Sequence, residues 1–142
     1  MASPCNKPAL VYKAVDLRPD GTMHSIIALP PLTVKYAVGQ VCYPTVPGCP
    51  LFCWRNCTAA ASWAKIVEAS CLGHAVVLKC EAEISIVKHI ETYIPCNSTS
   101  AQDFWARQYS NAAAGLVLNG KRTPQLVLAE WVKPLEIVAT FD

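Results

Sequence analysis

Residues 49–67 constrain the fold of this chain more than any other stretch. Leu51–Trp54 is short, apolar and aromatic, which is typical of a buried strand. Asn56 then fits a helix N-cap, because its side chain can accept a hydrogen bond from a free amide of the first turn. Apolar residues recur with the spacing of one helix face, at Ala60, Trp63, Ala64 and Val67. The stretch therefore predicts a strand, a turn and a helix that ends at Gly73 in a left-handed cap.

Segments rich in β-forming residues surround this unit. They predict strands at residues 10–15, 23–28, 33–38, 74–84, 115–118, 126–132 and 135–140. A turn is expected at 18–22, a second helix at 101–113, and a break at Pro134 because proline donates nothing to a ladder. This order predicts one α+β domain over residues 10–142, behind a loose arm at residues 1–9. Its sheet is expected to be mainly antiparallel, with about six to eight strands and two main helices.

The composition argues for a folded, soluble protein. The 142 residues are 53% hydrophobic and 15% charged, so there is ample apolar surface to bury. The net charge of +2 is spread along the chain, which argues against a nucleic-acid partner. No segment resembles a signal peptide or a membrane span, so we expect a cytoplasmic location, inside the host cell if the protein is viral. In that compartment the eight cysteines are expected to be free, packed thiols.

Several structural motifs of the chain resemble a family of small uncharacterised α+β proteins found in bacteria, phages and other microbial or viral genomes. The motifs are Val11–Val15, Ser25, Lys35–Gln40, Pro44, Leu51–Trp54 with Ala60, Trp63 and Ala64, and Thr123-Pro124 followed by Leu128–Leu135. They cover most of the chain and include an anchor tyrosine, a turn glycine and a helix face. The resemblance implies the fold described above and no activity. The cysteine enrichment and the alanine-rich helix depart from the family pattern.

The cysteine spacing raises two chemical hypotheses. Cys42, Cys49, Cys53 and Cys57 could together hold zinc, although they would lie on loop, strand and helix start, and we expect packing rather than a metal. Cys57 could alternatively act as a nucleophile, because amides and the dipole of a helix start lower a thiol's pKa. Its possible bases are the three histidines of the chain, His24, His74 and His89.

Acidic residues on the strands give a third hypothesis. Glu81 and Glu83 are two apart on one strand and so share a face, with Glu130 on a possible neighbour. Such carboxylates can serve acid–base chemistry when one is buried, but a solvated sheet face is the commoner case. An ADP-ribosyltransferase-like pattern could use Lys13, Ser25, Tyr36 and Glu130, although the first strand lacks the usual arginine or histidine.

A nucleotide-binding protein, such as a signal-nucleotide sponge, is the remaining alternative. It would need aromatic platforms and basic residues for phosphate. The candidates are Trp54, Arg55, Trp105, Arg107 and Arg122.

Few polar residues converge in the sequence, so we expect a non-catalytic accessory or interaction protein without a cofactor. A phage, a virus or a mobile element is a possible source. Its partner would be a protein, a small nucleotide or a second copy. Self-association is expected through the apolar strands at 126–132 and 135–140.

Overall fold

The computed structural model describes residues 8–26, 33–46, 49–85, 106 and 126–140. The elements are β1 (Ala9–Leu17), β2 (Met23–His24), β3 (Lys35–Tyr36), β4 (Leu51–Trp54), α1 (Cys57–Val67), the 3₁₀ turn η2 (Glu68–Ser70), β5 (His74–Ile84) and β6 (Leu126–Thr140). The described residues thus form a small α+β domain with a six-stranded antiparallel sheet and one α-helix, not two. The strand predicted at 115–118 and the helix predicted at 101–113 lie outside them, except for Ala106, which is helical. No helix in the described part is both long and apolar enough to cross a membrane.

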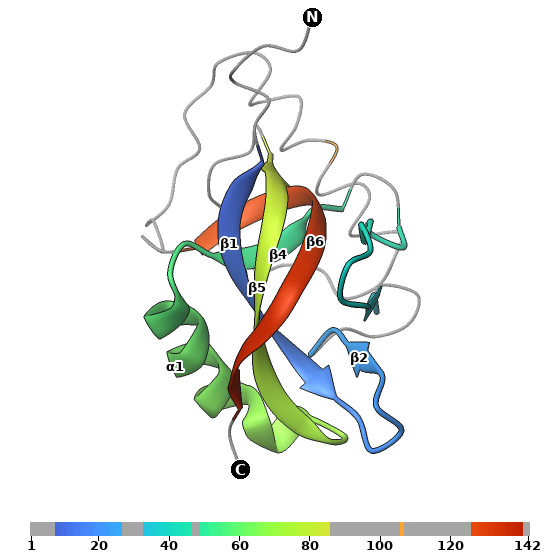
Figure 1. The fold of residues 1–142 in the computed structure, drawn as a ribbon, viewed down its shortest axis with the longest axis vertical. Helices are drawn as coiled ribbons and strands as arrows, with labels where there is room; N and C mark the ends of the chain where they lie inside the picture. The colour runs from blue at the N-terminus through green and yellow to red at the C-terminus, as the bar shows by residue number, and fades with distance from the viewer. Residues whose placement is uncertain (1–7, 27–32, 47–48, 86–105, 107–125, 141–142) are drawn as a thin grey trace, which may run out of the picture.

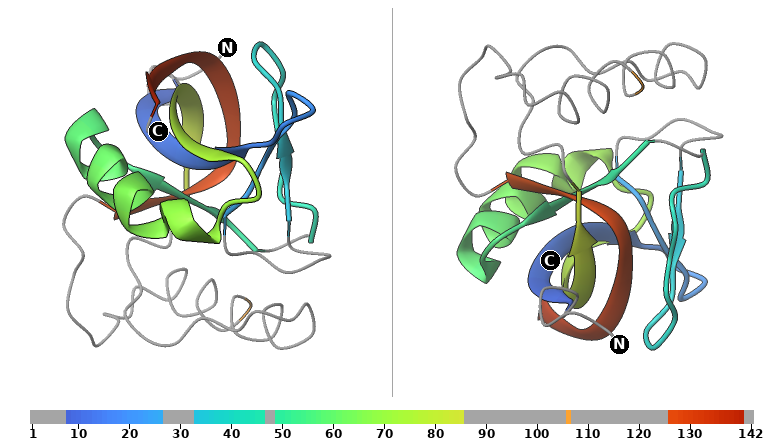
Figure 2. Two further views of the ribbon diagram at one scale, coloured as in Figure 1. Left: turned by 90° about the horizontal axis from the view of Figure 1, so that it is seen from below. Right: turned by 90° about the horizontal axis from the view of Figure 1, so that it is seen from above.

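The sheet closes on itself. Its order is β3-β2-β1-β4-β6-β5, and β5 also pairs with β1 along all nine residues from Ala9 to Leu17. Four strands, β1, β4, β6 and β5, therefore form a cycle in which each pairs with the next, and they coil around one another (Figures 1 and 2). The cycle is uneven, because β4 pairs with β6 at four positions and with β1 only at Tyr12 opposite Trp54.

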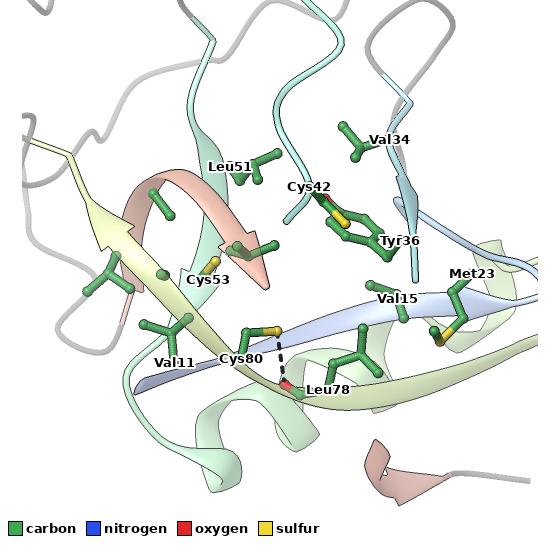
Figure 3. Close-up of a cluster of buried hydrophobic side chains, with 14 of the residues drawn as sticks. Val11, Val15, Met23, Val34, Tyr36, Cys42, Leu51, Cys53, Leu78 and Cys80 are labelled. Atoms are coloured by element: carbon green, nitrogen blue, oxygen red, sulfur yellow. Dashed lines mark hydrogen bonds between the residues drawn. The ribbon is translucent and has the colours of Figure 1, made fainter. Parts of the chain in front are cut away.

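Side chains alternate between two cores because successive strand residues point to opposite faces. Val11 and Val15 of β1 face the inside of the cycle, where they join the larger core with Leu78 and Val132 (Figure 3). Ala14 faces outward and joins the smaller core, which lies under α1. The β2–β3 hairpin lies on the other side of the cycle from α1 (Figure 2).

The helix begins as predicted and ends earlier. Asn56 caps it, since the Asn56 Oδ1 accepts a hydrogen bond of 2.8 Å from the Ala59 amide. Ala60, Ala64 and Val67 form its buried face. The prediction that Trp63 shares this face was wrong, because its side chain lies at the edge of the contact and is 39% exposed.

The predicted left-handed cap at Gly73 was also wrong. The helix ends at Val67 and continues as η2 to Ser70, and only Gly21 and Gly39 have a positive φ among the described glycines. Gly73 is required for space instead. A Cβ there would overlap the Leu17 carbonyl oxygen and lie 2.8 Å from the Arg18 Cα.

The strand predictions were confirmed for segments that pair with a neighbouring strand along their whole length. The spans 51–54 and 74–84 match β4 and β5, and β1 is longer than predicted. β2 and β3 have only two residues each, because they pair only at Met23 with Tyr36 and at His24 with Lys35. The predicted break at Pro134 was wrong: β6 runs through it, because the register with β5 shifts beside this residue and the Pro134 carbonyl accepts the Gly39 amide at 2.8 Å.

Candidate functional site

A charged group, the ammonium of Lys13, lies on the inward face of the closed cycle. Lys13 lies between Val11 and Val15 in the inward row of β1 and is 8% exposed. Its Nζ donates a hydrogen bond of 2.6 Å to the Phe52 carbonyl of β4. The same Nζ lies 5.4 Å from the centre of the Tyr36 ring, within reach of a cation–π interaction. A cation is thus held inside an apolar core by one carbonyl and one aromatic face.

Tyr36 brings a second polar group to this place. The side chain is 2% exposed, and its hydroxyl lies near both the Lys13 ammonium and the Ser25 side chain. Burial raises the pKa of Tyr36, while nearby Lys13 and Ser25 lower it in part. Ser25 itself is engaged, because its Oγ accepts the Val34 amide at 2.9 Å. The phenol is therefore neutral at pH 7, and it lies within interaction range of the Lys13 ammonium and the Ser25 hydroxyl.

Three buried thiols line the same core: Cys42, Cys53 and Cys80 (Figure 3). Burial raises the pKa of Cys80 to about 12 and also raises that of Cys53. Burial by itself lowers the pKa of Lys13, but the neighbouring Tyr36 and Cys53 raise it, and the pKa ends above its ordinary value. At neutral pH Lys13 is therefore an ammonium. The thiols beside it are uncharged, and uncharged thiols are poor nucleophiles.

The structure brings together three residues of the ADP-ribosyltransferase-like pattern. Lys13, Ser25 and Tyr36 converge from three different strands or their ends, although the sequence places them far apart. Glu130, the fourth residue of the pattern, lies on β6 and is half-buried. Lys13 and Tyr36 are buried and Ser25 is half-buried, so these residues do not form an exposed substrate cleft.

A second polar cluster, which sequence reasoning missed, holds the turn between η2 and β5. Asp16 is 3% exposed, and its two carboxylate oxygens accept the amides of Leu72 and Gly73, each at 2.9 Å. Arg18 Nε lies 3.6 Å from the same carboxylate. The signal that could have found it is Asp16, an acid between the apolar residues Val15 and Leu17 of β1.

Glu68 fixes the same turn from the other side. Its Oε2 accepts the Ala75 amide at 2.6 Å, and its Oε1 lies 3.4 Å from His74 Nδ1. Both carboxylates bind the backbone, so they hold a loop in place and are not free for chemistry.

The catalytic hypothesis for Cys57 gains no support from these contacts. Cys57 is the first residue of α1 and packs against the smaller core. His74 lies beyond the far end of the 11-residue helix, about 16 Å away along its axis. His24 pairs with Asp16 at the end of β1, four residues from the place where β4 meets that strand. His89 lies outside the described residues.

The four cysteines considered for zinc do not come together. Cys53 faces the larger core and Cys57 the smaller one, on opposite sides of the sheet. Within the described ranges, no group of three histidine, cysteine or acidic residues could hold a metal ion. The six cysteines described there are free thiols, as predicted.

The predicted nucleotide platform is described only in part. Trp54 is half-buried and packs against Trp63, with ring centres 6.1 Å apart and planes tilted by 41°. Arg55 beside it is exposed. Trp105, Arg107 and Arg122 lie outside the described residues. Part of the aromatic surface of Trp54 is therefore covered by Trp63 within the protein.

The acidic face of β5 has the character expected of a sheet surface. Glu83 is exposed and accepts a hydrogen bond of 2.9 Å from Trp131 Nε1, and Glu81 lies opposite Lys133 of β6. Both acids thus have neighbours of complementary chemistry across the ladder.

Comparison with known proteins identifies no relative: no family model, curated protein or solved structure matches the chain. The resemblance to small uncharacterised α+β proteins therefore stays a hypothesis.

Proposed function

We propose that this chain is a small, non-catalytic accessory or interaction protein that binds a partner through rigidly held apolar side chains. The observation that carries the proposal is Leu72, which is 73% exposed although its own amide is fixed by the buried Asp16. A buried carboxylate and an obligatory glycine hold the turn, and the side chain that it displays is apolar. Because such a residue loses little freedom on binding, it suits an interface anchor.

The end of α1 offers a second apolar side chain close by in the chain. Ile66 is 72% exposed in the last turn of the helix, on the side away from the buried face. Single exposed apolar residues are ordinary on protein surfaces. Ile66 at the end of the helix and Leu72 in the clamped turn support a small binding patch at this corner, which fits a protein partner better than a nucleotide.

A second copy is another partner that the structure supports. The end of β6 has three exposed apolar residues, Leu135, Ile137 and Val138, and in the described part of the chain no strand pairs with its outer edge there. The first part of this edge is occupied, because 126–129 pairs with β4 while Val132 and Pro134 bond to Cys42 and Gly39. Of the two strands expected to self-associate, only 135–140 therefore has an available edge. Register shifts bend this end, which favours a weak contact.

The other functions expected from the sequence remain weaker proposals. A nucleotide ligand would rest on the exposed Arg55 beside Trp54. An ADP-ribosyltransferase-like activity would rest on Lys13, Ser25 and Tyr36, and the burial of Lys13 and Tyr36 argues against it. An origin in a phage, a virus or a mobile element is proposed from the family resemblance alone.

Site-specific photocrosslinking tests the proposal. A photoreactive residue at position 72 or 66 should give a discrete adduct in extract of the cells that make the protein. The same residue at position 10, where Leu10 is 53% exposed at another place on the sheet, is the matched control. Asp16→Asn should weaken the adduct at position 72 by loosening the turn. Equal labelling at all three positions, or release of nicotinamide from a nicotinamide dinucleotide by the purified protein, would overturn the proposal.

A further inference from the structure

We infer that residues 38–43, together with the exposed end of β6, form a contact surface for a second copy of this chain. The inference deepens the self-association proposed for the end of β6 and rests on that proposal, but it does not involve the corner at Leu72. It starts from the place where exposed apolar side chains gather. Of the ten large hydrophobic side chains that are exposed in the described part of the chain, six lie here: Val38, Val41, Tyr43, Leu135, Ile137 and Val138.

Residues 38–43 are held against β6 by backbone hydrogen bonds. The Gly39 amide donates to the Pro134 carbonyl at 2.8 Å, and Cys42 and Val132 exchange two bonds of 2.6 and 3.0 Å. The segment lies on the side of the cycle away from α1 (Figure 2). It is therefore fixed before a partner arrives, so its backbone loses little conformational entropy on binding.

The burial of Cys42 decides which way its neighbours point. The Cys42 side chain belongs to the larger core, so Val41 and Tyr43, one position away on either side, point away from that core. Tyr43 is 64% exposed, the most of any tyrosine or tryptophan in the described ranges. Tyrosine is among the residues that contribute most to protein interfaces, so Tyr43 is the expected anchor.

The surface continues onto β6. Because the segment runs antiparallel to β6, the hydrogen bond between Gly39 and Pro134 brings Val38 next to Leu135. The exposed apolar residues that follow Leu135 on β6 extend the surface toward the end of the strand.

The exposed area is sufficient for a dimer. The six side chains are between 36% and 64% exposed, which corresponds to roughly 500 Å² of surface, near the upper end for a patch on a monomer. Two copies that face each other would bury roughly 1,000 Å², the area at which a specific interface begins. We therefore expect a dimer with a dissociation constant in the micromolar range.

The charges beside this surface balance, which suits a copy of the same surface. Lys133 and Glu136 flank the start of the exposed end of β6, and across the ladder Lys133 faces Glu81 while Glu136 faces Lys79. A surface with a large net charge would repel its own copy. The paired charges here allow the same patch on two copies to meet across a twofold axis.

Sedimentation equilibrium of the purified, reduced protein tests the inference. The wild type should pass from monomer to dimer as its concentration rises from about 1 to 500 µM. Tyr43→Ser should raise the dissociation constant at least about tenfold, because the anchor is lost from both copies. Ile66→Ser is the matched control, because Ile66 is also exposed but lies on α1, and it should leave the dissociation constant unchanged. Both positions are exposed, so both variants should keep the fold.

Photocrosslinking of the purified protein gives a second reading. A photoreactive residue at position 41 should link two copies, whereas one at position 66 should not. A strictly monomeric wild type would overturn the inference, as would a dimer that Tyr43→Ser leaves intact, which would keep self-association but move it to another surface. An adduct at position 41 that forms only in cell extract, with a different protein, would also overturn it. The adduct at position 72 tests the corner separately, so either proposal can fail while the other holds.

Discussion

Replacing Asp16 by asparagine tests whether the buried carboxylate holds the turn between η2 and β5. In the native protein each carboxylate oxygen accepts one amide at 2.9 Å, from Leu72 and from Gly73. Asparagine keeps one acceptor and turns an NH₂ group toward the other amide, so a donor faces a donor. A hydrogen bond to a charged group contributes about 1.5–3 kcal/mol, and a buried unsatisfied donor costs about 1–3 kcal/mol. We expect Asp16→Asn to lower the free energy of unfolding by about 3 kcal/mol.

Urea unfolding followed by circular dichroism measures this loss, which corresponds to a fall in melting temperature of about 10 °C for a domain of this size. Hydrogen exchange should become faster at the Leu72 and Gly73 amides. Asp20→Asn is the control: Asp20 also accepts an amide, that of Thr22, but in an exposed turn, so its effect should be much smaller. Equal losses for the two variants, or unchanged exchange at the turn, would refute the assignment of Asp16 as its clamp.

Three further substitutions test other parts of the fold. Gly73→Ala should cost about 3 kcal/mol or more in urea unfolding, because its Cβ would overlap the backbone of β1, whereas Gly21→Ala, with φ of 87° in open space, should cost about 1 kcal/mol. Asn56→Ala should cost about 1 kcal/mol through loss of the helix cap, against no loss for Thr58→Ala on the exposed side of the helix. Burial raises the pKa of Cys80 from 9.0 to about 12, so above pH 9 the unfolded chain releases this proton first and stability falls as pH rises. Cys80→Ala should reduce the slope of stability against pH between 9 and 12 by about 1.4 kcal/mol per pH unit, and an unchanged slope would contradict the raised pKa.

Elements whose signal is local could be predicted from the sequence, and those set by distant contacts could not. β4, β5 and the start of α1 follow from alternation, helical spacing and a capping residue. The closure of the sheet depends on the pairing of β1 with β5, which joins residues from Leu17 with His74, 57 positions apart, to Ala9 with Ala82, 73 positions apart, and leaves no local trace. Pro134 illustrates the limit. A proline normally breaks a strand, but a shifted register and the Gly39 amide accommodate it within β6.

The candidate site also combines features that local sequence signals predict with features that depend on distant contacts. Alternation along β1 already places Lys13 in the row of Val11 and Val15, so its burial could have been inferred from the spacing of two. What the sequence does not contain is the reason a cation is tolerated there. That reason is the geometry of the closed cycle, because β4 follows β6 for four positions and meets β1 at only one.

The Lys13 side chain lies where β4 no longer pairs with β1 but still pairs with β6. Its ammonium reaches the Phe52 carbonyl just beyond the single β1–β4 pair, so a side-chain hydrogen bond joins the two strands where the ladder has ended. A methionine at this position could fill the space, but it could not make that bond. An arginine would not fit the same space without moving Tyr36, whose ring lies 5.4 Å from the ammonium. A closed cycle of so few strands thus favours a long, flexible cation at its weakest junction, where the Phe52 carbonyl and the Tyr36 ring receive its charge.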